Sequence, residues 1–120
     1  MARHDHLPLF KSCYVLCLDV YKITHNFERE YKYTLGEKMK DAAHEMLDKV
    51  VETNSRKNRE KVNSLNSLDV LAERLIIYFR ISCDLKLISP AYLAKLAERF
   101  EDIGKQTGSW KKWAENNKLI

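Results

Sequence analysis

The sequence has few of the residues that interrupt regular structure, with only three glycines and two prolines among 120 residues. A fold of many short strands needs such residues at its turns, so their scarcity argues against one. The longest apolar run, residues 75–79, is far too short to span a membrane, and the first residues lack the apolar segment of a secretory signal. We therefore expect a cytoplasmic, helical protein with one domain and one core.

Patterns typical of enzymes and metal sites are also missing. The three cysteines, Cys13, Cys17 and Cys83, include no CxxC pair, and we interpret them as reduced core thiols. Asp41-x-x-His44 has the spacing found in di-iron bundles, but such a site needs the motif on two helices. No glycine-rich phosphate loop and no GxSxG motif is present. The sequence predicts neither an enzyme nor a metal or cofactor site.

Apolar residues recur at steps of three and four, the period of a helix that buries one face. Four segments have this pattern, and the predicted helices cover about residues 7–25, 34–54, 56–87 and 90–107, before a flexible tail at 109–120. In the first of these helices, Tyr14 and Tyr21 are placed in the buried stripe. Short connections between amphipathic helices favour an antiparallel, up-down-up-down four-helix bundle that forms a single domain over residues 1–120.

The connections carry signals of their own. Thr34 and Glu37 have the spacing of a capping box. Asn54-Ser55 is expected to end the second helix, with Ser55 available to cap the third. Ser89-Pro90 has the pattern of an N-cap followed by proline in the first turn, so it is expected to begin the fourth helix.

The third predicted helix is too apolar for a monomer, because its second half has apolar residues outside the buried stripe. A helix that is apolar nearly all round lies either in a larger core or in a subunit interface. A chain of this length can hardly surround it. We therefore expect self-association, with an oligomer interface at Val70, Ile77, Tyr78 and Ile81.

Basic residues are concentrated in two segments, although the formal net charge is only +4. Residues 56–61 carry +3 and residues 105–120 another +3, so the rest of the chain carries −2. In an up-down-up-down bundle these segments share one pole, which indicates a polyanionic partner such as nucleic acid. A solvated rim that aids solubility is the alternative. The candidate nucleic-acid-binding residues of the two segments are Arg56, Lys57, Arg59, Lys61, Lys105, Lys111 and Lys112.

Arg80 and the two tryptophans have two interpretations each. Arg80 lies one turn before Asp84, so it either forms a salt bridge within the helix or binds phosphate on a surface shared between subunits. Trp110 and Trp113 flank two lysines, a pattern typical of base stacking and equally of aromatics that close a bundle end. We favour the closing role for Trp110 and leave Trp113 open.

Several segments together resemble a known family. In chain order they are Tyr21-Lys22-Ile23-Thr24 with Phe27, Tyr33-Thr34-Leu35-Gly36, Asp41-Ala42-Ala43, Asn58-Arg59-Glu60-Lys61, Arg80 with Asp84-Leu85, Leu87-Ile88-Ser89, and Ile103-Gly104 with Gly108-Ser109-Trp110. Their order over about residues 7–113 resembles the accessory variability determinant (Avd) family of diversity-generating retroelements. It also resembles related four-helix proteins encoded in intervening sequences of bacterial ribosomal RNA genes. The chain departs from the family where Glu28 replaces a common proline and Gly-Ser replaces Gly-Gly before Trp110.

The resemblance implies a homopentameric barrel and a non-enzymatic accessory that binds a reverse transcriptase and its template RNA, or DNA or an RNA/DNA hybrid. Such an accessory supports mutagenic cDNA synthesis. The matching basic positions are Arg59, Lys61 and Arg80, whereas the other candidates rest on electrostatics alone. The alternative is a helical oligomeric scaffold of the ribosomal RNA intervening-sequence type, which makes protein–protein contacts only.

Overall fold

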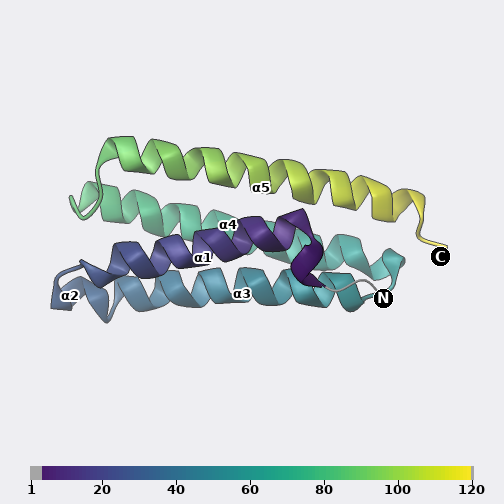
Figure 1. Cartoon of the computed structure of the whole chain (residues 1–120), viewed down its shortest axis with the longest axis horizontal. Coiled ribbons are helices and arrows are strands. Elements are labelled where there is room, and N and C mark those ends of the chain that lie inside the picture. The colour runs from purple at the N-terminus through teal and green to yellow at the C-terminus, as the bar shows by residue number, and fades with distance from the viewer. Residues whose placement is uncertain (1–3, 120) are drawn as a thin grey trace.

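A computed structural model describes residues 4–119, and in that range the protein is helical without strands. A 3-10 turn at His4–His6 (η1) comes first. The helices are α1 (Pro8–His25), α2 (Arg29–Lys32), α3 (Leu35–Ser55), α4 (Asn58–Asp84) and α5 (Pro90–Asn116). The four long helices form an elongated bundle of 50 × 22 × 21 Å (Figure 1). The predicted all-α bundle is confirmed.

The helices alternate in direction, and each long helix packs against two others. α3 lies between α1 and α4, while α5 lies between α4 and α1, with the smallest of these interfaces between α1 and α5. Consequently α1 and α4 lie on opposite sides of the bundle. One end of the bundle, here called the terminal pole, consists of the α3–α4 turn and the C-terminal end of α5 (Figure 1). There the Asn58 Nδ2 donates to the Asn117 carbonyl at 3.0 Å.

The core is made by one stripe from each long helix. The steps of three and four in the sequence bring together side chains that are almost completely buried, among them Leu16, Val20, Met39, Met46, Leu65, Leu68, Leu75, Phe79, Leu96 and Ile103. Phe79 of α4 meets Phe100 of α5 with their ring centroids 5.9 Å apart. The predicted periodicity therefore identified the inward face of each helix, apart from Tyr14 and Tyr21 of α1, which are exposed.

α5 extends well beyond its predicted end at residue 107, so the expected flexible tail is wrong for residues 109–116. Gly108 lowers the helix propensity by about 1 kcal/mol relative to alanine. Tertiary packing outweighs this cost, because Ala114 is fully buried and Trp110 packs against the core. Lys111 also forms an ion pair with Asp69 of α4.

Two of the three predicted caps are not formed. The Thr34 hydroxyl donates backward to the Glu30 carbonyl at 2.7 Å, so no capping box precedes α3. Ser55 is the last residue of α3 and does not cap α4, which begins later than predicted, at Asn58. Ser89 does cap α5, since its Oγ accepts from the Tyr92 backbone N–H at 3.1 Å.

α4 ends at Asp84, three residues before the predicted boundary at 87, and the reason lies in Lys86. This residue has φ of 63°, in the left-handed region. Its N–H donates to the Cys83 carbonyl, and the Leu87 N–H donates to the Ser82 carbonyl at 2.8 Å. The two bonds make a Schellman motif, which usually has glycine where Lys86 stands.

Lys61 joins three helices at the terminal pole. Its side chain is only 7% exposed, and its Nζ donates to the Thr53 carbonyl at 2.7 Å and to the Asn54 carbonyl at 3.3 Å. These carbonyls are at the C-terminal end of α3, where a cation is favoured by the helix dipole. The ammonium also lies 5.6 Å from the centroid of the Trp110 ring on α5. Burial lowers the pKa of Lys61.

We expect Lys86→Gly to stabilise the protein by roughly 0.5–1 kcal/mol, because glycine adopts a positive φ without a steric cost. The matched control is Lys95→Gly on the exposed side of α5, which should destabilise by about 1 kcal/mol. Urea unfolding followed by circular dichroism measures both. Destabilisation by both substitutions to a similar extent would contradict the role assigned to Lys86.

We expect Lys61→Met to destabilise the fold by about 1–2 kcal/mol, because the buried Thr53 carbonyl loses its donor. Lys57→Met, which changes the same charge at an exposed position, should alter the free energy of unfolding by less than about 0.5 kcal/mol. Equal effects in chemical unfolding would show that Lys61 has no structural role.

Candidate nucleic-acid interface

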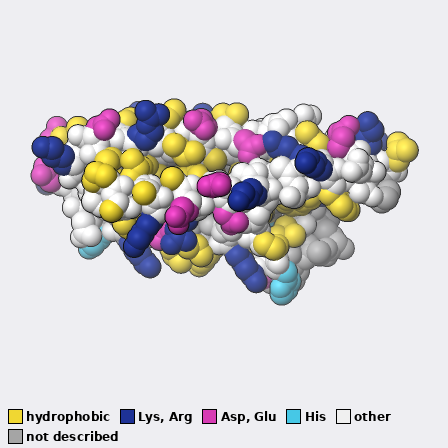
Figure 2. Space-filling model, turned by 90° about the horizontal axis from the view of Figure 1, so that it is seen from above, with side chains coloured by type: hydrophobic (Ala, Val, Ile, Leu, Met, Phe, Trp, Pro, Cys, Tyr) yellow, Lys and Arg dark blue, Asp and Glu magenta, His cyan; other side chains and the backbone are white. Residues whose placement is uncertain are grey.

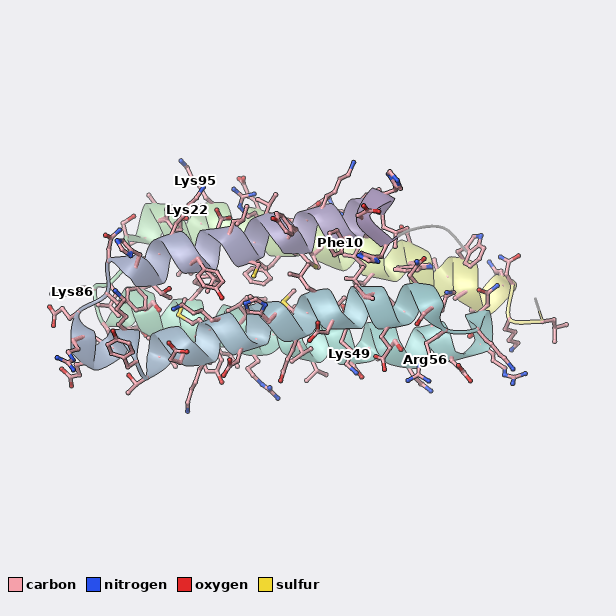
Figure 3. All side chains as sticks on the ribbon, turned by 60° about the horizontal axis from the view of Figure 1, so that its bottom comes forward. Phe10, Lys22, Lys49, Arg56, Lys86 and Lys95 are labelled. Atoms are coloured by element: carbon pink, nitrogen blue, oxygen red, sulfur yellow. The ribbon has the colours of Figure 1, made fainter. Side chains whose placement is uncertain are left out.

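The terminal pole brings the two basic segments together, as predicted. Arg56, Lys57 and Arg59 lie on the α3–α4 turn and the first turn of α4, beside the end of α5 that carries Lys111 and Lys112. Figure 3 shows Arg56 projecting from the bundle near this end. With the buried Lys61, six of the eight candidate residues therefore lie close to one pole, but the structure gives them different roles.

Arg56 shares its charge with an acid. Its guanidinium donates to Glu52 at 2.9 Å, and Lys49 contacts the other oxygen of the same carboxylate at 2.9 Å. Hydrogen bonds from Arg56 and Lys49 lower the pKa of Glu52, and the same contact raises the pKa of Arg56. The three side chains together carry a net charge of only +1, which weakens the attraction of Arg56 for an anion.

The ammonium groups of Lys111 and Lys61 contact other helices of the same chain and stabilise the fold. Lys111 is half-buried and paired with Asp69, whose other oxygen accepts from the Thr107 hydroxyl at 2.9 Å. Lys61 is buried and donates to carbonyls of α3. The prediction of Lys61 and Lys111 as surface cations therefore has to be corrected, because neither ammonium is directed at solvent. The sequence shows their charge but not the carbonyls and the carboxylate that they meet.

Three exposed candidates at this pole have no acidic partner in the described part of the chain. Lys57, Arg59 and Lys112 are exposed, and none of them forms an ion pair within residues 4–119. We call these three residues the cation cluster. Lys105 is exposed too, with a loose contact of 3.6 Å to Glu101 on the same helix. A cluster of unpaired cations attracts phosphates without having to break existing ion pairs.

The two tryptophans differ in exposure. Trp110 is half-buried, packs against the core and covers Lys61, as expected for an aromatic that closes the bundle end. Trp113 is 50% exposed and follows Lys112 directly. Its ring is therefore available for stacking against an unpaired base.

Arg80 lies far from the cation cluster. Along α4 it is about 30 Å from Arg59, toward the opposite pole. It does not form the predicted salt bridge with Asp84 in the described part of the chain. Instead it lines an apolar groove of 510 Å³ between α4 and α5, with Leu93, Ala97 and Glu101 among its neighbours. In Figure 2 hydrophobic side chains gather in the half of the bundle nearer the α4–α5 turn.

Several exposed apolar side chains are grouped on each of two helices, α4 and α1. On α4 these are Val70, Ile77 and Ile81, as the interface prediction requires, whereas Tyr78 is half-buried and packs against the core. α1 exposes Tyr14, Val15, Leu18 and Tyr21. The predicted buried stripe of α1 includes both tyrosines, so this exposed face is not evident from the periodicity. Each lies at the edge of that stripe, where the position of α3 decides how much of the ring is covered.

His44, Cys13 and Cys17 are each engaged within the bundle. His44 Nε2 lies 2.8 Å from the Tyr21 hydroxyl, and within residues 4–119 no three His, Cys, Asp or Glu side chains are placed to hold a metal ion. Cys13 and Cys17 are buried, and burial together with the neighbouring Cys17 raises the pKa of Cys13 to about 12. Among the described helices none is long and apolar enough to cross a membrane.

Comparison with known proteins identifies the family of the chain. Residues 9–114 match the model of the family described as bAvd-like, a stretch that includes all of α3 and α4 and nearly all of α1 and α5. No curated protein and no solved structure matches the chain. The resemblance to the Avd family is thereby confirmed, and the chain belongs to the bAvd-like family.

Proposed function

We propose that this protein is a non-enzymatic accessory of a diversity-generating retroelement, which assembles as a homopentamer and binds RNA together with a reverse transcriptase. Membership of the bAvd-like family supports the accessory role. The observation that carries nucleic-acid binding is the cation cluster, Lys57, Arg59 and Lys112, which has no acidic partner among residues 4–119 at the pole where α3, α4 and α5 meet. The reverse transcriptase as partner rests on the family alone.

Assembly into a ring would repeat the cation cluster and so increase the positive charge at one end. In a ring with cyclic symmetry every copy has the same orientation relative to the axis, so every terminal pole lies at the same end. Three unpaired cations per copy are then repeated around one rim. Such a rim attracts a polyanion more strongly than a single copy with a net charge of +4, and the attraction falls with salt as counterions are released.

The exposed Trp113 fits the same partner. Its ring adjoins Lys112, so a base stacked on the indole would have its phosphate near an ammonium. This arrangement favours RNA with unpaired bases over a fully paired duplex, whose bases are stacked on one another.

The second candidate function is a helical scaffold that binds proteins only. It is favoured by the apolar groove between α4 and α5 and by the exposed apolar residues of α1 and α4, which are surfaces suited to protein contact. The two functions differ in one measurable property, which is salt-dependent binding of RNA.

For RNA binding, we expect the double variant K57E/R59E to bind a structured RNA with single-stranded loops at least about tenfold more weakly than the wild type. The affinity falls because two unpaired positive charges per copy are replaced by negative charges. Fluorescence anisotropy at several salt concentrations measures the affinity, and the slope of log affinity against log salt should become shallower by about 1–2.

The control is R29E/K38E, which makes the same change of charge at the opposite pole and should leave the affinity nearly unchanged. Undetectable RNA binding by the wild type at low salt would favour the protein-only scaffold. Equal loss in both double variants would mean that the terminal pole has no special role.

For the assembly, we expect multi-angle light scattering of the purified protein to give five times the mass of the chain. The apolar residues exposed on α1 and α4 supply the surface that drives association. A monomer at micromolar concentration would contradict the proposed oligomer.

A further inference from the structure

Two outward faces of the bundle are apolar, and the described residues 4–119 leave both of them uncovered. The α1 face consists of Tyr14, Val15, Leu18 and Tyr21, which are 39–50% exposed. The α4 face consists of Val70, Ile77 and Ile81, which are 40–61% exposed. Aromatic and aliphatic side chains grouped in this way are typical of the central part of a protein interface.

The two faces are on opposite sides of the molecule, because α1 and α4 each pack on α3 and α5 and hardly on one another. A twofold contact of one face with itself leaves the other face exposed. A contact between the α1 face of one copy and the α4 face of another covers both faces in every copy. This kind of head-to-tail contact generates a closed ring when the rotation between neighbouring copies closes, and an open filament when it does not.

Charges around the two faces are complementary. Lys11 and Lys22 are exposed on α1, eleven residues or about three turns apart, so they lie on the same side as Leu18 between them. Glu73 and Asp84 are exposed on α4 at the same spacing and border the α4 face. The two lysines are therefore separated by about the same distance along their helix as the two acids, roughly 16 Å. Figure 3 shows Lys22 projecting outward from α1.

None of these four residues forms an ion pair within residues 4–119. The nearby acid of α1, Asp19, is buried and paired with Arg99 of α5 at 2.9 Å. On α4, Arg74 lies 3.8 Å from Glu45 of α3, and Arg80 lines the groove toward α5. The α1 face is thus bordered by two unpaired lysines, and the α4 face by two unpaired acids.

These charges distinguish between the ways in which two copies can meet. Contact of two α1 faces would oppose lysines to lysines, and like charges across an interface disfavour association. Contact of two α4 faces would bring the two pairs of acids together. Contact of an α1 face with an α4 face places each lysine near an acid and buries aromatic rings against Ile77 and Ile81.

The geometry points to a head-to-tail interface in which the α1 face of one copy docks on the α4 face of the next, with Lys11 and Lys22 opposite Glu73 and Asp84. This inference rests on the self-association stated under Proposed function and assigns the surfaces that carry it. In this arrangement the exposed tyrosines of α1 form part of the subunit interface.

The test is a charge swap. K11E/K22E and E73K/D84K should each raise the apparent dissociation constant of the oligomer at least about tenfold, measured by sedimentation velocity over a dilution series. The fourfold variant K11E/K22E/E73K/D84K should recover the assembly of the wild type, because each contact again joins opposite charges. The control R29E/K38E changes the same number of charges on α2 and on the exposed side of α3 and should assemble normally.

The possible outcomes distinguish failure of the assigned interface from failure of the proposed oligomer. Circular dichroism first confirms that each variant is folded, as expected for substitutions at exposed positions. An assembled wild type together with assembled K11E/K22E and E73K/D84K would overturn the assigned interface and leave the oligomer intact. A folded fourfold variant that stays dissociated would also overturn the pairing. A monomeric wild type would contradict both the proposed oligomer and the assigned interface.

Discussion

The burial of α4 between α3 and α5 is the constraint on which the rest of the structure depends. Leu65, Leu68, Leu75 and Phe79 are fully excluded from solvent, and each contributes about 1.5–3 kcal/mol of transfer free energy. This packing determines the direction of the neighbouring helices and therefore where their ends meet. The α3–α4 turn and the end of α5 share a pole because α5 continues as a helix to Asn116 beside α4.

That arrangement divides the basic residues between stability and binding. Lys61 and Lys111 hold helices together through carbonyls and a carboxylate, and Arg56 shares a carboxylate with a lysine on α3. Lys57, Arg59 and Lys112 have no such partner among the residues that the structure describes. A cation already paired within the fold gains little from a phosphate, since the existing contact has to be exchanged. The proposed RNA surface is accordingly smaller than the count of lysines and arginines in these segments suggests.

The sequence and the structure agree best where periodicity carries the information. All four long helices and most of their inward faces were predicted, because a buried stripe with steps of three and four has few alternatives. The errors lie where local signals compete with packing. Thr34 has the spacing of a cap but its hydroxyl donates backward to Glu30, and Gly108 lies within a helix because buried Ala114 keeps α5 against the bundle. Tyr14 and Tyr21 lie at the margin of the α1 stripe, where periodicity alone does not separate inside from outside.

By itself the sequence determined the helical class, the order of the helices, the family and the concentration of positive charge in two segments. These follow from residue types and spacing along one chain. Only the tertiary structure decided which cations remain unpaired, that Arg80 is remote from them, and that α1 has an apolar face opposite the one on α4. The reason is physical: the partner of a charged or apolar side chain is a group distant in sequence, as Asp69 is for Lys111, and the packing of helices determines which group that is.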